Sequence, residues 1–289
     1  MEFAGLKEGA LTNINHIYDA VSRSQISAVL YSYLFILSLT SCSDSDPDTS
    51  RSVNQVYASA ESVSMINNAK VNRYEVLFLG NSHIAKIPEL ITAFVDGQAS
   101  AKSIETHDTP NFSFLDEKLK DLSTVNLLEN NSWTHVVLQG QKYSQSGIYD
   151  YSTAETKEWI RKTKAKQATP VLYPEHPQIG DVGEGIRVLN LHREIASDES
   201  SCVAPVGAAW KRVMEQHPDI NLHSPDGNHA NLTGQFLTAM VLYEVITGES
   251  ADMLPYIETI DIAPEVQDLF GQVVTDLMFN TEACPENGE

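Results

Sequence analysis

Short apolar runs alternate with longer amphipathic segments along most of the chain. Runs rich in branched and aromatic residues predict buried strands at residues 74–79, 134–139, 170–173 and 202–206, with a weaker fifth at 101–106. Helical patterns fall between and after them, at residues 87–95, 114–122, 153–166, 184–195, 208–216, 232–247 and 265–278. This alternation predicts an α/β fold with a parallel sheet covered by helices on both faces.

The carboxyl ends of the predicted strands are where a functional site is expected, because ligands bind at that edge of an open parallel sheet. The turns concerned follow Leu79, Thr106, Gln139, Tyr173 and Val206. The segment at residues 173–177 carries two prolines, a glutamate and a histidine. We expect it either to shape a pocket at this edge or to form a plain loop.

The N-terminal part departs from this pattern. Residues 26–39 are apolar over the length of a signal-peptide core, and they lead into Leu39-Thr40-Ser41-Cys42. That ending resembles the bacterial lipobox, which implies that Cys42 is lipidated and becomes the first residue of the mature protein. The protein would then be anchored to a membrane of the bacterial cell envelope, facing the periplasm or the exterior. The alternative is a buried hydrophobic helix followed by an unrelated cysteine.

The first residues do not suit a signal peptide, which opens with a positively charged segment. Here the acidic residues Glu2, Glu8 and Asp19 come first. We therefore expect translation to start nearer Val21, through a non-AUG codon, so that residues 1–20 are not normally made. The predicted organisation is a signal peptide at 1–41, a lipidated cysteine and flexible polar tether at 42–72, one folded domain at 73–280 and a tail at 281–289.

Composition narrows the range of partners. The 289 residues carry a formal net charge of −20, which argues against nucleic acid, because phosphate binding requires a basic surface. The membrane would be contacted through the lipid anchor only.

The sequence has no phosphate-binding glycine loop, His-x-x-x-His or Cys-x-x-Cys pattern, so we predict no cofactor and no metal. Ordinary polar or pocket roles are expected for four histidines: His83, His107, His135 and His176.

The three cysteines leave one question open. If Cys42 is lipidated, Cys202 and Cys284 remain. A disulfide between them is permitted outside the cytoplasm, but sequence alone cannot bring them within bonding distance. Two free thiols are the alternative.

Ser82 lies where the first predicted strand ends and a helix follows a few residues later. Gly80 permits the tight path from strand to turn. A serine in this position can aim its own amide at a developing oxyanion, with the helix dipole assisting. The run Gly80-Asn81-Ser82-His83 does not match the G-x-S-x-G motif of α/β-hydrolases. Since a serine in such a turn commonly caps the helix, Ser82 alone does not establish a nucleophile.

A base for this serine is available near the C-terminus. Asp226 and His229 stand three residues apart in a loop rich in proline, glycine and asparagine. The carboxylate can accept a hydrogen bond from the Nδ1–H of the same imidazole, which leaves Nε2 free to take the serine proton. Asn231 is placed to cap the next helix, and Gly248 to end it. The alternative makes Asp226 a turn residue and His229 a surface residue.

Together the two segments resemble the SGNH (GDSL-like) hydrolase family. Gly80-Asn81-Ser82 matches the family's nucleophile block, and the D-x-x-H block matches at Asp226 and His229. The resemblance covers roughly residues 73–250 and is nearest to an uncharacterised branch of bacterial exported proteins. It implies a three-layer α/β/α sandwich with a mainly parallel, five-stranded, flavodoxin-like sheet. It also implies a catalytic triad of Ser82, Asp226 and His229.

The remaining blocks of the family are altered here. The family uses an asparagine side chain after the third strand as an oxyanion donor. By that resemblance Gln141 occupies this position, and Gln139 is the alternative. The backbone amide of Ser82 would be a further oxyanion donor. The second block normally supplies a glycine amide. This sequence has none there, so a backbone amide near Asp108 or Thr109 would have to serve, because Pro110 cannot donate.

The resemblance implies a serine esterase that cleaves carboxylic esters, such as O-acetyl or other acyl groups on glycans or small molecules. The altered blocks motivate an alternative, a lipid-anchored binding protein that keeps the fold without turnover. A third possibility is a metal-dependent phosphoesterase, whose activity chelators would abolish.

Overall fold

The computed structural model describes residues 65–109, 112–181 and 183–285. The predicted signal peptide, Cys42 and most of the predicted tether lie outside these residues. So does Pro110 of the altered second block. In the part of the chain that is described, no helix is long and apolar enough to cross a membrane.

A five-stranded sheet forms the centre of the fold, as the sequence predicts. Its strands are β1 (Arg73–Leu79), β2 (Ser103–Asp108), β3 (His135–Gln139), β4 (Thr169–Tyr173) and β5 (Cys202–Val203). They lie in the order β2-β1-β3-β4-β5, and every pairing is parallel. This is the flavodoxin-like order, in which the chain reverses its direction of winding beside β1. All residues of β3 and β4 are buried, because helices cover both faces.

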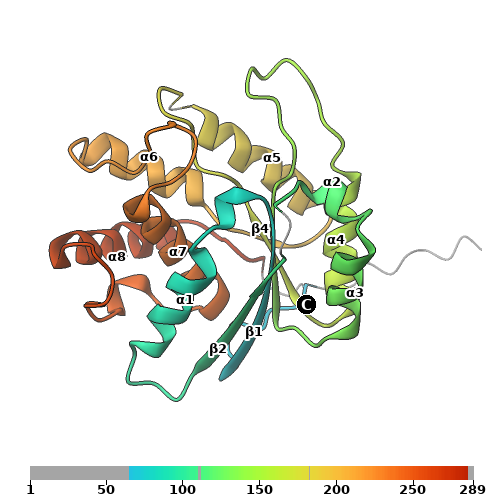
Figure 1. Cartoon of the computed structure of the whole chain (residues 1–289), viewed down its shortest axis with the longest axis horizontal. Helices are drawn as coiled ribbons and strands as arrows, with labels where there is room; N and C mark the ends of the chain where they lie inside the picture. The colour runs from blue at the N-terminus through green and yellow to red at the C-terminus, as the bar shows by residue number, and fades with distance from the viewer. Residues whose placement is uncertain (1–64, 110–111, 182, 286–289) are drawn as a thin grey trace, which may run out of the picture. The chain divides into compact units, whose positions relative to one another are not determined.

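Two layers of helices enclose the sheet (Figure 1). One layer holds α1 (Ile87–Asp96), α6 (Val206–Gln216), α7 (Leu232–Thr247) and α8 (Pro264–Phe279). The other holds α2 (Leu115–Lys118), α3 (Leu122–Asn130), α4 (Ala154–Ala165) and α5 (Glu184–Asp198). Alternate residues of β1 face opposite layers: Val76 and Phe78 pack with the first, Leu77 and Leu79 with the second. The predicted three-layer α/β/α sandwich is therefore confirmed.

Several element boundaries differ from those predicted. The helix expected at 114–122 ends early, as α2, and α3 was not predicted. Asp121 between them is extended, and its side chain accepts a hydrogen bond from the Ser123 amide at 3.0 Å, which starts α3. The strand expected at 202–206 ends at Val203, since Pro205 cannot donate to a ladder and α6 begins directly after it. The edge strand β2 is half exposed, so its apolar pattern is weak, and it lies two residues later than predicted.

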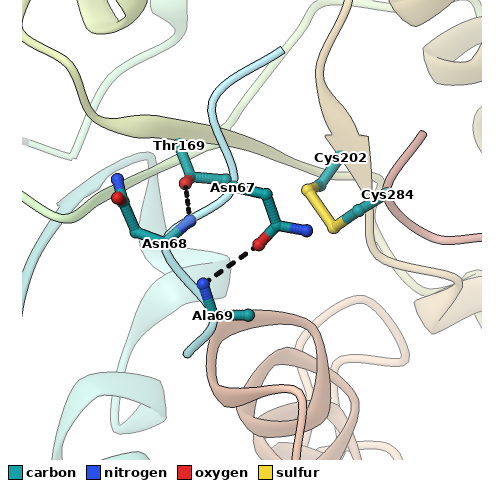
Figure 2. The surroundings of a disulfide bond; sticks show 6 residues. All are labelled: Asn67, Asn68, Ala69, Thr169, Cys202 and Cys284. Carbon is teal, nitrogen blue, oxygen red and sulfur yellow. Dashed lines mark hydrogen bonds between the residues drawn. A yellow bond between two sulfur atoms is a disulfide. The ribbon is translucent and has the colours of Figure 1, made fainter. Parts of the chain in front are cut away.

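A disulfide joins Cys202 of β5 to Cys284, and so answers the question that the sequence left open (Figure 2). The Val203 amide also donates to the Ala283 carbonyl at 2.7 Å, so the C-terminal segment lies along the edge strand. Figure 2 shows residues 67–69 beside this disulfide. Because these residues are polar, we predicted them to be part of the flexible tether. The Asn68 amide, however, donates to Thr169 Oγ1 at 2.9 Å, where β4 begins.

Candidate active site

The carboxyl edge of the sheet brings three chain segments together. The first is a 3-10 turn, η1 (Ser82–Ile84), which follows β1 after two residues. The second is the segment after β4 that contains Glu175, and the third is the loop that leads into α7 and carries His229. These are the positions at which an open parallel sheet assembles its ligand sites.

Ser82, His229 and Asp226 form a continuous hydrogen-bonded chain. Ser82 Oγ lies 2.7 Å from His229 Nε2, and His229 Nδ1 lies 2.6 Å from Asp226 Oδ2. An ionised carboxylate can only accept, so Nδ1 carries the ring proton and Nε2 accepts from the serine hydroxyl. The two segments, about 140 residues apart in the sequence, therefore meet in the arrangement that a serine nucleophile requires.

Local structure holds the Asp226–His229 loop in place. Gly227 adopts a positive φ of 71°, and Asp226 Oδ1 accepts from the amides of Asn228 at 3.0 Å and His229 at 2.9 Å. The hydrogen bond from the His229 ring, with those from the two amides, holds the pKa of the Asp226 carboxyl well below its usual range. Asn231 then caps α7 by accepting from the Gly234 amide at 3.0 Å, as predicted.

Asn81, and not Ser82, caps the turn that carries Ser82. Asn81 Oδ1 accepts from the His83 amide at 3.0 Å, which leaves the Ser82 hydroxyl for His229. The helix α1 starts only at Ile87, after Lys86 with a positive φ of 66°. A short 3-10 turn therefore separates Ser82 from α1, and the help expected from the dipole of that helix stays a prediction. No hydrogen bond from the Ser82 amide to another described residue is found.

Neither Gln141 nor Gln139 has a side-chain NH₂ free to donate to an oxyanion at Ser82. The Gln141 amide nitrogen donates to the carbonyls of Lys142 at 2.7 Å and Ser152 at 3.0 Å, and its Oε1 accepts from Thr156 at 2.6 Å. Gln141 is buried, with all of its polar atoms bonded at the start of α4. It does not line the cleft at Ser82. The predicted oxyanion role of Gln141 therefore needs correction: two loop carbonyls and Thr156 of α4 hold its side chain.

Gln139, the rival, is fully buried and also bonded at both ends. Its Oε1 accepts from the Asn81 amide at 2.7 Å, and its Nε2 donates to Glu175 Oε1 at 2.6 Å. The two residues expected to supply the second-block amide, Asp108 and Thr109, do not line the cleft at Ser82. Thr109 is buried and accepts from Lys118 Nζ at 2.7 Å.

A cleft with a volume of about 810 Å³ opens over Ser82 and His229. Its walls combine aromatic rings with hydroxyl and amide side chains. The residues that line it are Asn81, Ser82, His83, Phe112, Phe114, Lys142, Tyr143, Ser144, Gln145, Ser146, Tyr149, Tyr151, Glu175, Asn228 and His229. Most of the aromatic wall comes from the loop between β3 and α4, which sequence reasoning passed over. The cluster of tyrosines and serines at 143–151 was the available signal.

Glu175 confirms the expectation that the segment at 173–177 shapes a pocket. It lines the cleft, and its side chain is 10% exposed. Its Oε2 lies 3.5 Å from the Tyr143 hydroxyl and 3.9 Å from His83 Nε2. Burial, together with the nearby carboxylate of Glu184, raises the pKa of Glu175 to about 7, although hydrogen bonds from Asn81, Tyr143 and Gln139 oppose this.

The histidines take the roles of ordinary packing and pocket residues, with one cluster to note. His176 stacks on Trp210 with ring centroids 4.0 Å apart, and buried His135 bonds to Thr134. His107 shares the sheet edge with Glu75 and Glu105, and these three offer ligand atoms within 4.8 Å of one another. Both carboxylates of that cluster are paired with Arg73, and none of the three lines the cleft.

Comparisons with known proteins support the fold. No family model matches the chain. No curated protein sequence matches it either. Among solved structures, a DUF4886 family protein from Bacteroides uniformis aligns at 14% identity over 74% of this chain and 98% of its own, with a TM-score of 0.61.

Two further solved structures are named for hydrolases. A candidate SGNH hydrolase from Slackia heliotrinireducens aligns at 24% identity over 60% of this chain and 99% of its own, with a TM-score of 0.48. A catalytic mutant of an acetylxylan esterase from Geobacillus stearothermophilus aligns at 14% identity over 62% and 97%, with a TM-score of 0.47. At these sequence identities the similarity concerns the fold alone. The Bacteroides uniformis protein, with its TM-score of 0.61, is the one that supports the fold.

Proposed function

We propose that this protein is a serine hydrolase of the SGNH type that cleaves carboxylic esters. The observation that carries the proposal is the hydrogen-bonded chain from Ser82 Oγ through the His229 ring to Asp226, with distances of 2.7 and 2.6 Å. It lies in a cleft at the carboxyl edge of an open parallel sheet. A serine that is only structural has no need of a base held in one tautomer by a carboxylate.

In the proposed reaction Ser82 Oγ attacks the ester carbonyl while His229 Nε2 takes its proton. Asp226 accepts the hydrogen bond from Nδ1–H and stabilises the imidazolium. The free Ser82 amide donates to the oxyanion. Collapse of the tetrahedral intermediate breaks the ester C–O bond, and His229 returns its proton to the leaving alcohol. Water, deprotonated by His229, then attacks the acyl-serine, and the acid leaves as Ser82 recovers its proton. The His229 side chain is 40% exposed, which leaves room for that water.

The cleft supports an acylated glycan as the substrate. Phe112, Tyr149 and Tyr151 line it and are 49–69% exposed, so their ring faces are open to a ligand. Sugar rings stack on such faces, and the serine, glutamine and asparagine side chains between them can bond to hydroxyl groups. A long acyl chain would instead favour an enclosed apolar tunnel. The acidic excess of the chain disfavours polyanionic glycans.

We also propose that the protein is exported and held to a bacterial membrane through lipid on Cys42. The disulfide between Cys202 and Cys284 supports an oxidising compartment, where such bonds persist. Metabolic labelling with a fatty acid tests the anchor. Label should enter the wild type and be absent from Cys42→Ala, whereas equal labelling of both would overturn it. Because the mature protein would begin at Cys42, the start near Val21 is tested by peptide mass spectrometry of the unprocessed precursor, and peptides from residues 2–20 would contradict it.

A fluorophosphonate probe and a p-nitrophenyl acetate assay test the hydrolase. The wild type should be labelled and active, Ser82→Ala should show neither, and kcat should fall by about 10⁴-fold or more. Ser197→Ala is the matched control, since its hydroxyl bonds to the Glu194 carbonyl on an exposed helix face away from the cleft. A wild type that neither reacts nor hydrolyses would favour the binding protein that the altered oxyanion blocks suggest. Activity lost on chelation would favour a metal enzyme.

A further inference from the structure

The residue before the nucleophile is held by two buried side chains from neighbouring strands. The Asn81 amide donates to Gln139 Oε1 at 2.7 Å, and Gln139 Nε2 donates in turn to Glu175 Oε1 at 2.6 Å. Asn81 Nδ2 also approaches that carboxylate oxygen, at 3.4 Å. A Cβ at Gly80 would lie only 2.4 Å from Gln139 Oε1, so the glycine gives Gln139 its access to the turn.

The chemical nature of Glu175 decides which way this chain of hydrogen bonds runs. A carboxylate can only accept, so it draws the NH₂ of Gln139 toward itself and turns the carbonyl of Gln139 toward Asn81. A neutral group that can donate at position 175 would remove this constraint. Gln139 could then rotate and turn its NH₂ toward the Asn81 amide, where two donors would face each other.

The carboxylate is costly to keep at this position. Glu175 is almost fully buried, and Tyr143 connects it to a second buried carboxylate, Glu184, which lies 3.1 Å from the tyrosine hydroxyl. Two further titratable groups interact with it: His83, whose ring stacks on His229, and the buried Tyr173. A buried amide would be the more stable choice, and retention of a charge at such a place is typical of functional sites.

We infer that Glu175 and Gln139 form a positioning clamp, whose ionised form orients Asn81 and with it the Ser82 amide that receives the oxyanion. The inference rests on the proposed hydrolase function. Neither clamp residue bonds to Ser82, His229 or Asp226, so the clamp acts on kcat through the geometry of the turn. Misplacement of a catalytic group by about 1 Å can lower a rate by about 10²-fold.

Exchange of the two residue types between positions 139 and 175 tests the clamp directly. Glu175→Gln should lower kcat by about 10- to 10²-fold with little change in KM. Gln139→Glu should lower kcat at least as much, because it places a second carboxylate next to that of Glu175. The double variant Glu175→Gln/Gln139→Glu restores the order, because the carboxylate now on β3 would accept from the Asn81 amide and from the side-chain amide introduced after β4. It should recover most of the activity of the wild type. Activity of the double variant no higher than that of either single variant would overturn the clamp.

The pH profile provides a second readout. With the pKa of Glu175 near 7, kcat of the wild type should rise as the pH passes from about 6 to 8, because the carboxylate is the orienting form. The part of the rise that Glu175 causes should be absent in Glu175→Gln, so the two pH profiles should differ. Glu244→Gln is the control: this half-buried carboxyl also has a raised pKa but bonds to Ala251 and Thr275, away from the site. A pH profile of kcat that is the same in the wild type and in Glu175→Gln would contradict the clamp.

Hydrogen exchange at the Asn81 amide separates the clamp from the hydrolase function. Exchange should be slow in the wild type and faster in Glu175→Gln, whether or not the protein turns over an ester. Equal exchange in the two overturns the clamp. Slow exchange in an inactive wild type would keep the clamp and reject the hydrolase. Circular dichroism and thermal unfolding establish that each variant is folded before it is compared.

Discussion

The imidazole of His83 stacks on that of His229, with ring centroids 5.0 Å apart and an angle of 20° between the planes. Burial, and then the positive charge that His229 can carry, lower the pKa of His83 to about 4. His83 therefore stays neutral at neutral pH. In the proposed mechanism it presents a flat face to the His229 ring and adds no second charge when His229 becomes an imidazolium.

Removal of this wall should slow the reaction modestly. In His83→Ala the ring of His229 loses a stacking contact, and kcat should fall by roughly threefold to tenfold. His83→Phe keeps a flat face at the same place and should stay close to the wild type. Steady-state kinetics on p-nitrophenyl acetate measure both. An equal loss in the two variants would mean that His83 acts through its nitrogens.

Asp226→Asn should separate catalysis from folding. The amide oxygen can still accept from the backbone amides of Asn228 and His229, so the loop should keep its shape and Tm its value. The amide NH₂ can, however, hold the wrong tautomer of His229, and kcat should fall by about 10³- to 10⁴-fold. Kinetics and thermal unfolding together check this. A loss below about tenfold would show that exposed Asp226 is not the orienting group.

Gln141→Leu should affect stability and leave catalysis nearly unchanged. In the variant the Thr156 hydroxyl and the carbonyls of Lys142 and Ser152 lose their hydrogen bonds to Gln141. The free energy of unfolding should therefore fall by about 2–3 kcal/mol. Loss of an oxyanion donor would lower kcat by about 10²- to 10³-fold. Denaturant unfolding and kcat distinguish the two roles. A large fall in kcat at unchanged stability would restore Gln141 to the oxyanion site.

The disulfide should contribute strongly to stability. Cys202 and Cys284 are 82 residues apart, and closing a loop of that length stabilises a fold by about 4 kcal/mol. The double variant Cys202→Ala/Cys284→Ala should therefore unfold at lower denaturant, while kcat at low temperature should hold, since neither cysteine lines the cleft. Unfolding of the wild type with and without a reductant is the control. Equal midpoints in the wild type and the variant would show that the Val203–Ala283 contact suffices.

Much of the fold and the trio at its edge could be predicted because the signals are local. Strands and helices alternate with clear periodicities, and Gly248 and Asn231 end and start α7 as expected. Ser82 follows a strand, and Asp226 stands three residues before His229 on one loop. Chain order and spacing were enough to pair them as neighbours, since the carboxyl ends of parallel strands share one edge.

The direction of the buried amides could not be predicted in this way. A glutamine after a strand looks the same in sequence whether it faces a substrate or a helix. Thr156 of α4 occupies Gln141, and Glu175 after β4 occupies Gln139, and each partner lies 15 or more residues away along the chain. The aromatic wall of the cleft likewise depends on how the loop after β3 folds back over η1.

The sequence by itself determined the α/β architecture and the residues that meet at Ser82, because strand periodicity and turn chemistry act over a few residues. Only the tertiary structure decided which polar groups remain free there. Hydrogen-bond donors and acceptors buried together must satisfy one another, and that matching depends on distances across the whole fold. It gives both glutamine side chains hydrogen-bond partners within the fold, and leaves the amide of Ser82, a residue that lines the cleft, without a partner among the described residues.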